Sequence, residues 1–252
     1  AGAFDDVDAA MMVHPSQRNL VYRKTLGRIK LFMDFRGKPS HASAAPDKGV
    51  NALDALVSTY QNIGLLRQQL PPTTRIHGII TDGGRAPNII PEFTSALYYL
   101  RTPDREFLPD LLCRVQACAE GAAHAHGAKV EFREDPIRYE PMKYNPELVG
   151  LFEANLRALG VEPEPVDPVN TRDSGSTDMG NLSWKVPAIH PYLQLVPAGI
   201  ANHTHEFAEA SGGVPGKNML RLGATAMAIT AVDLLAAPGK MAAVKKCFEE
   251  GD

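Results

Sequence analysis

The sequence lacks features that mark several large classes of protein. Its 252 residues include three cysteines, and these form no CxxC pair. An odd number of cysteines without such spacing argues against a disulfide framework and favours a reducing compartment, for which we expect the cytoplasm. Cys113 and Cys118 fall in a stretch with helical character and are expected to be buried as small apolar side chains.

Strong charge bias and long apolar runs are also missing. Lys and Arg number 26 and Asp and Glu 29, so the net charge is −3, which predicts neither a nucleic acid nor a membrane as partner. We see no apolar run near the roughly 20 residues of a spanning helix, and no secretory leader. The chain opens at Ala1 and its first methionine is Met11, from which we expect a piece of a longer polypeptide.

The remaining composition is that of a globular protein, with 44% hydrophobic and 22% charged residues, enough for a sizeable core. Alternating apolar residues predict strands, and apolar residues at helical spacing predict helices. In residues 28–133 these patterns predict the order βαββαβ, a ferredoxin-like sandwich of four antiparallel strands and two helices. The expected elements are strands at 28–35, 74–81, 95–100 and 129–132, and helices at 48–69 and 105–124.

The flanking parts of the chain have a different pattern. A short apolar strand is expected at 9–13, ending at His14. Helices are expected at 146–159, where Asn145 can cap and Pro146 suits the first turn, and at 217–236. This part is predicted to be α/β. We therefore divide the chain into 1–24 and 138–252, which form one domain, and an inserted domain at 25–137.

Several side chains could carry chemistry, although each also has a structural interpretation. His14 at a strand end, and His203 or His205 in ANHTHEF, could bind a metal ion or be ordinary core and loop residues. His41 lies in the small-residue loop GKPSHAS, where an exposed histidine is more often functional. Asn88 stands on a turn that it could simply cap. Arg101 ends a strand, where it could pair with a carboxylate or be solvated, and the loop Ser174, Gly175, Ser176, Thr177 could bind an anion or cap a helix.

Taken together, these segments resemble a known family. GKPSHASAAPDKGVNALDA, GGRAPNIIP and YYLR resemble the lid or dimerisation domain of the zinc aminoacylase/dipeptidase metallopeptidases (clan MH). SGSTDMGNLS, PAIHPY and NHTHEFAEASG resemble the second half of that family's catalytic domain. The resemblance covers essentially the whole chain and is closest to the branch that cleaves β-alanyl-lysine and Xaa-Arg dipeptides. Aminobenzoyl-glutamate hydrolase subunits are slightly further away.

The resemblance implies hydrolysis of an amide bond in a dipeptide or N-acyl amino acid, by a homodimer that pairs through the lid. It implies two zinc ions, with His14 and His203 each a ligand of a different ion. His203 is preferred to His205 because the matching histidine precedes Thr204. His41 is implied to reach across the dimer and donate to the developing oxyanion. Further implied substrate-binding residues are Asn88, Arg101, Ser174, Gly175, Ser176 and Thr177.

The family pattern is incomplete in this chain. Its bridging carboxylate and its Glu-Glu pair, which holds the general base, precede the segment AGAF and are not in the sequence. Glu249-Glu250 stands at the other end of the chain and is interpreted as a solvated tail. This chain alone is therefore expected to bind zinc poorly and to be inactive. The alternative hypothesis is a non-catalytic dimerisation or binding fragment. The choice of substrate stays open, with Asp173 and Asp178 leaning toward a basic one.

Overall fold

The computed structural model describes residues 2–171 and 174–251. It divides into two compact units, one formed by Ala1–Thr25 with Met142–Asp252 and the other by Leu26–Pro141. We call them the discontinuous unit and the continuous unit. Both contain helices and strands, so the predicted α/β class is confirmed.

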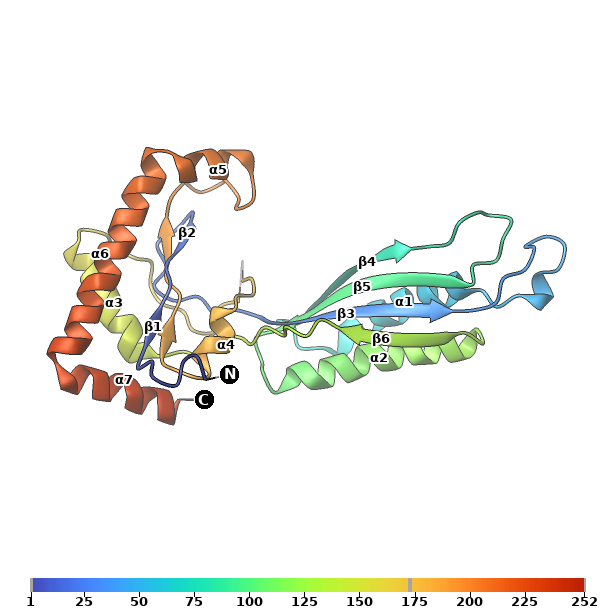
Figure 1. Ribbon diagram of the computed structural model, residues 1–252, viewed down its shortest axis with the longest axis horizontal. Helices are drawn as coiled ribbons and strands as arrows, with labels where there is room; N and C mark the ends of the chain where they lie inside the picture. The colour runs from blue at the N-terminus through green and yellow to red at the C-terminus, as the bar shows by residue number, and fades with distance from the viewer. Residues whose placement is uncertain (1, 172–173, 252) are drawn as a thin grey trace. The chain divides into compact units, whose positions relative to one another are not determined.

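The continuous unit is built on one antiparallel sheet (Figure 1). Its strands are β3 (Gly27–Arg36), β4 (Arg75–Asp82), β5 (Phe93–Thr102) and β6 (Lys129–Glu134), in the spatial order β4-β5-β3-β6. Along β3 every second side chain is buried, as the alternation of Ile29, Leu31, Met33 and Phe35 predicts. This alternation places Arg28 and Lys30 on the opposite face of the sheet.

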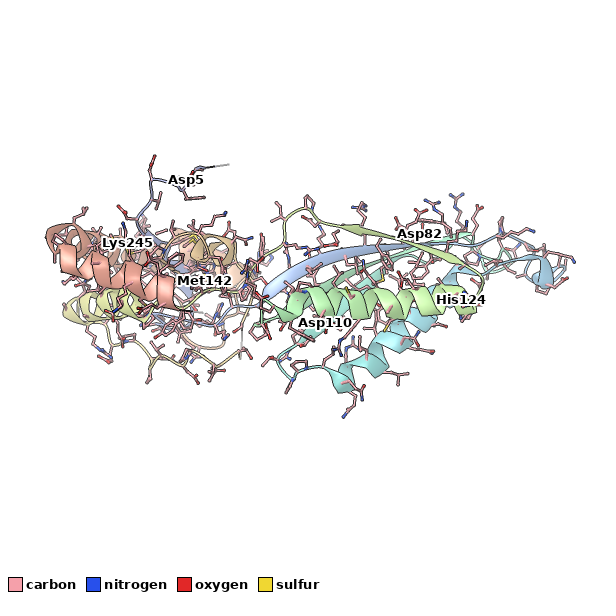
Figure 2. The ribbon with its side chains drawn as sticks, turned by 90° about the horizontal axis from the view of Figure 1, so that it is seen from below. Asp5, Asp82, Asp110, His124, Met142 and Lys245 are labelled. Atoms are coloured by element: carbon pink, nitrogen blue, oxygen red, sulfur yellow. The ribbon has the colours of Figure 1, made fainter. Side chains whose placement is uncertain are left out.

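Two helices cover the apolar face of this sheet, α1 (Ala52–Leu66) and α2 (Phe107–Ala125), and Figure 2 shows α2 lying along it between Asp110 and His124. The side chain of Asn51 caps α1 by accepting from the backbone amides of Leu53 and Asp54. Short 3-10 helices lie at Pro46–Lys48 and Arg67–Gln69. Cys113 on α2 is exposed and Cys118 is half-buried, so the prediction that both are buried was wrong.

The discontinuous unit contains two short pairs of parallel strands. Strand β1 (Ala10–Met11) pairs with β7 (Ala188–Ile189), and β2 (His14–Ser16) pairs with β8 (Tyr192–Gln194). The expected single strand at 9–13 is therefore interrupted, and His14 begins a strand instead of ending one. This places His14 directly opposite Tyr192.

Helices form most of the core of the discontinuous unit: α3 (Pro146–Ala158), α4 (Met179–Ser183), α5 (His205–Gly212), α6 (Val214–Ala236) and α7 (Pro238–Glu250). Asn145 caps α3 as predicted, by accepting from the backbone amide of Leu148. Glu249 and Glu250 are exposed as predicted, but they end helix α7 instead of forming an irregular tail.

Helix α6 is the one helix, among the residues that the structure describes, that is long and apolar enough to cross a membrane. Its most apolar window has a mean hydropathy of 1.5, and 22% of that window is buried. This differs from the expectation that no segment reaches such a length. Core helices of soluble proteins meet the same criterion, so length and composition alone assign no membrane to this chain.

Candidate functional site

His14 is held with one ring nitrogen available for a ligand. Its Nδ1 lies 2.7 Å from the carbonyl oxygen of Pro15. A carbonyl oxygen can only accept, so Nδ1 carries the proton and the Nε2 of the neutral ring keeps its lone pair. Metal-binding histidines commonly have this arrangement, with the second nitrogen donating to a backbone carbonyl.

Around His14 is a cluster of rings and one cation, which we call the His14 cluster. The His190 ring stacks on Tyr192 with centroids 4.8 Å apart and meets the edge of His14 at 5.6 Å. The Arg23 guanidinium lies 4.1 Å from the centre of the Tyr192 ring. His190 is 5% exposed, and neither ring nitrogen has a hydrogen-bond partner among the described residues.

Burial and neighbouring cations keep His190 neutral. Desolvation, together with charge repulsion from His14 and Arg23, lowers the pKa of His190 to about 4. Asp178 acts in the opposite direction and is the weakest of the four influences. His190 therefore packs as an uncharged ring beside His14 at neutral pH.

His203 precedes α5 in an unusual backbone conformation. Its φ is +68°, in the left-handed region that residues other than glycine seldom adopt, and its side chain is exposed. The next residue, Thr204, caps α5 by accepting from the backbone amide of Phe207. Strained residues of this kind cluster at functional sites. His205 is the first residue of α5 and is also exposed.

The described residues do not by themselves supply a complete zinc site. A catalytic zinc takes about three protein ligands. In residues 2–171 and 174–251, no group of three or more His, Cys, Asp or Glu side chains is close enough to hold a metal ion. His14 is oriented as a ligand, but it belongs to no group of three potential ligands among the described residues.

The predicted substrate loop begins at the edge of the described residues. The Ser174 hydroxyl donates to the carbonyl oxygen of Lys24, which ties the loop to the first segment of the unit. The Thr177 hydroxyl accepts from the backbone amide of Met179 and so supports the short helix α4. Gly175 and Ser176 are half-buried, whereas Asp178 is exposed. Asp173 lies outside the described residues.

In the continuous unit, His41 and Asn88 lie side by side on two loops at one end of the sheet. His41 forms an antiparallel bridge with Ile89, and the Ala42 amide donates to the Asn88 carbonyl oxygen over 3.0 Å. Both loops leave the same end of the sheet in Figure 1, and both side chains are exposed. The structure therefore brings these two candidates together.

The proton on the His41 ring is at the opposite nitrogen from that of His14. The backbone amides of Ser43 and Ala44 donate to Nδ1 of His41 over 3.3 and 3.2 Å. An Nδ1 that accepts from two N–H groups carries no proton, so the neutral ring has its N–H at Nε2. His41 thus presents a donor, where His14 presents a lone pair.

Arg101 lies near the other end of the sheet. It is the penultimate residue of β5 and pairs with Arg28, whereas Phe93 at the start of β5 pairs with Arg36, just before the His41 loop. Eight residues at about 3.3 Å each place Arg101 roughly 26 Å along the strand from that end. Within one copy of the chain, His41 and Asn88 therefore cannot share a small substrate with Arg101.

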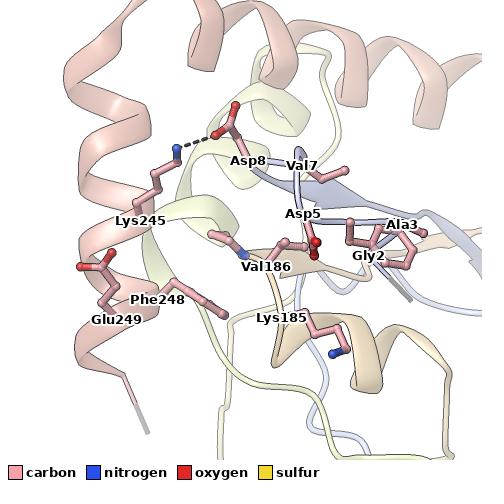
Figure 3. Close-up of a pocket in the computed structure, with 12 residues that line it drawn as sticks. Gly2, Ala3, Asp5, Val7, Asp8, Lys185, Val186, Lys245, Phe248 and Glu249 are labelled. Atoms are coloured by element: carbon pink, nitrogen blue, oxygen red, sulfur yellow. Dashed lines mark hydrogen bonds and ion pairs between the residues drawn. The ribbon is translucent and has the colours of Figure 1, made fainter.

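A cavity of about 840 Å³ lies elsewhere in the discontinuous unit (Figure 3). It is lined by the first residues of the chain, by Lys185–Pro187 and by α7, and an ion pair between Lys245 and Asp8 crosses one side. None of the candidate site residues lines it. Its walls mix both charges, which selects no class of ligand.

Comparisons with known proteins show that the chain is similar to peptidases and amide hydrolases. Residues 23–127 match the peptidase dimerisation domain of the M20 peptidases. The Xaa-Arg dipeptidase of Mus musculus is 39% identical over 249 residues, which are 99% of this chain and 58% of that protein. One of the subunits of the p-aminobenzoyl-glutamate hydrolase of Escherichia coli (strain K12) is 27% identical over 99% of this chain and 62% of its own length.

Solved structures agree on the fold. The aminobenzoyl-glutamate utilization protein from Klebsiella pneumoniae superposes with a TM-score of 0.66 at 17% identity, covering 92% of this chain and 56% of that one. The chain is similar to the M20 peptidases, which confirms the resemblance found in its sequence. It spans less than two thirds of the length of the curated relatives that it matches.

Proposed function

We propose that this chain is part of a zinc-dependent hydrolase that cleaves the amide bond of a dipeptide or an N-acyl amino acid in the cytoplasm. The observation that carries the proposal is the 39% identity to an Xaa-Arg dipeptidase along 99% of the chain. Its histidines support the proposal physically, since His14 presents a lone pair and His41 presents an N–H.

In this proposal each candidate has a defined task. His14 and His203 are ligands of two zinc ions, whose remaining ligands and general base lie outside the described residues. When bound, the metal activates water and polarises the carbonyl group. The Nε2–H of His41 donates to the oxygen on which negative charge develops. Asn88, Arg101 and the loop Ser174, Gly175, Ser176, Thr177 hold the substrate.

We propose that the continuous unit is an inserted lid of the ferredoxin-like type and that two copies form a dimer through it. The separation of roughly 26 Å between Arg101 and the His41 end of the sheet supports this, because a second copy can bring its His41 to the first copy's Arg101. Edge strand β4 is open on one side and exposes Ile79 and Ile80. An edge of this kind can pair across a two-fold axis.

The substitution Ile79→Lys is expected to convert the dimer to a monomer at micromolar concentration, because a charged side chain on an edge strand opposes pairing. Light scattering gives the mass. Ile137→Lys is the matched control, since Ile79 and Ile137 are 61% and 60% exposed and Ile137 lies outside the strands. A monomeric parent protein, or a dimer that survives Ile79→Lys, would count against this interface.

The 252-residue chain alone is expected to bind zinc weakly, with a dissociation constant well above micromolar, because the described residues hold no group of three potential ligands. A competition titration against a chromophoric chelator measures it. Tight binding of two zinc ions would show that the chain carries a complete site. Weak binding fits both the proposed enzyme and a second candidate function, a non-catalytic dimerisation fragment, which the lack of such a group among the described residues favours.

The activity of the native protein, as isolated from its source, distinguishes the proposed hydrolase from the non-catalytic fragment. We expect the native protein to release free amino acid from Xaa-Arg dipeptides or N-acyl amino acids, and to stop doing so when a chelator removes zinc. The same substrates with an amidated C-terminus are the matched control for recognition of the carboxylate. Absence of hydrolysis with zinc present would favour the non-catalytic fragment.

A further inference from the structure

Three arginines lie in one row across the sheet of the continuous unit. Arg28 on β3 pairs with Arg101 on β5, which pairs on its other side with Arg75 on β4. All three belong to the face that α1 and α2 leave uncovered, because their neighbours Ile29, Leu100 and Ile76 are buried toward the helices. Like charges directly opposite each other destabilise a sheet, so the row has a cost in stability.

Tyr99 lies between two of these arginines. The Arg28 guanidinium is 5.1 Å from the centre of the Tyr99 ring and the Arg101 guanidinium 5.5 Å. The Tyr139 ring packs on the Arg28 guanidinium as well, with the ring centre 4.1 Å away. Arg75 is turned away, since it donates to the backbone carbonyls of Pro72 and Thr74. Aromatic rings thus fix the positions of the Arg28 and Arg101 guanidinium groups.

The surroundings of Arg28 supply no anion in contact with it. Its Nε is buried without a hydrogen-bond partner in the part of the chain that the structure describes, and no described carboxylate forms an ion pair with it. Asp135 influences Arg28 only at longer range, because this carboxylate pairs with Lys30 at 3.3 Å and accepts from the Ile137 amide. A buried donor without a partner costs free energy that a bound acceptor would recover.

The excess of positive charge also lowers the pKa values of neighbouring groups. Burial lowers the pKa of Arg101, and the nearby Arg28 lowers it further. Burial and Arg101 lower the pKa of His77, which packs edge-on against Tyr99 at 5.6 Å. The positive charges around Tyr99 therefore repel and destabilise one another, and an anion bound among them would reduce this repulsion.

We propose that Arg28, acting with Arg101 on either side of Tyr99, is a second specificity residue that binds the carboxylate of the substrate. This inference rests on the proposed function and adds Arg28, which no sequence motif indicated. A guanidinium presents donors in a planar fork that matches a carboxylate, and stacking on tyrosine keeps that fork in place. The chemistry selects substrates with a free carboxylate over their amides.

The experiment is an NMR titration of the 252-residue chain, following the arginine Nε–Hε resonances. The probe is N-acetyl-arginine, with its C-terminal amide and inorganic phosphate as comparisons. We expect N-acetyl-arginine to shift the Arg28 and Arg101 resonances together, and the amide to shift neither. Arg28→Gln should weaken binding about tenfold or more, as the loss of a charge-assisted hydrogen bond does.

Two variants separate an anion site from a structural role. Arg28→Lys keeps the charge without the fork and is expected to bind more weakly than the parent. Arg133→Gln is the matched control, because Arg133 is on the same face with its guanidinium 3.9 Å from the centre of the Phe32 ring. Unchanged affinity in Arg28→Gln, equal binding of the amide or of phosphate, or no shift at Arg28 would overturn the inference. Two outcomes would rule out Arg28 and leave the proposed function intact. One is that Arg101→Gln weakens binding and Arg28→Gln does not. The other is that the native protein carrying Arg28→Gln hydrolyses its substrate normally.

Discussion

Replacing His41 with alanine is expected to lower kcat of the native protein by about 10²–10³-fold, the usual loss for one oxyanion donor. The reason is the fixed tautomer: Nδ1 accepts from the Ser43 and Ala44 amides, so Nε2–H is the donor. KM and zinc content should change little, because His41 is assigned to the developing charge rather than to substrate or metal. Steady-state kinetics with metal analysis measures all three.

The control for this variant is His124→Ala, which removes an exposed histidine from α2 in the same unit. It should retain parental kcat. A His41→Ala protein with unchanged kcat, or one that has lost its zinc, would remove His41 from the role proposed for it.

Acidification is expected to destabilise the metal-free chain by about 3 kcal/mol through His190 alone. The pKa of His190 is about 4 in the folded chain and 6.5 in its ordinary state. Between these two pH values the unfolded chain binds one proton more at His190 than the folded chain does. The contribution of His190 to the free energy of unfolding is therefore full above about pH 6.5, decreases as the pH falls and levels off below about pH 4. A shift of about 2.5 pH units at 1.36 kcal/mol each gives the estimate.

Urea unfolding of the metal-free chain at a series of pH values tests this. His190→Phe keeps an aromatic ring against Tyr192 and should flatten the slope between pH 6.5 and 4. His205→Gln serves as the exposed-histidine control. If His190→Phe and the parent lost stability in parallel, His190 would not be the group responsible.

The sheet of the continuous unit could be predicted from sequence because its signals are local. Every second residue of β3 is apolar, and Asn51 stands where a cap is needed. Helix α7 was missed because it begins without a side-chain cap and has a polar, charged end. It is held by distant contacts, such as the Lys143 ammonium donating to the Phe248 carbonyl oxygen, that no window of sequence reveals.

The candidate site was predictable to a lesser extent. Motifs identified His14 and His41, but the proton position on each ring depends on backbone groups whose placement needs the folded chain. The burial of His190 and the pairing of Arg28 with Arg101 depend on residues far apart in sequence. The separation of Arg101 from His41 follows from antiparallel register, which the sequence does not specify.

We propose an amide-hydrolase site that two copies of the chain complete together. Its most direct test is the activity of a mixed dimer of His14→Ala and His41→Ala subunits, co-expressed with different tags. Each variant alone should be nearly inactive. An equal mixture should recover about a quarter of the parental activity, because half of the dimers would hold one intact site of two. No recovery in a purified mixed dimer would show that the His41 of one copy does not complete the site of the other.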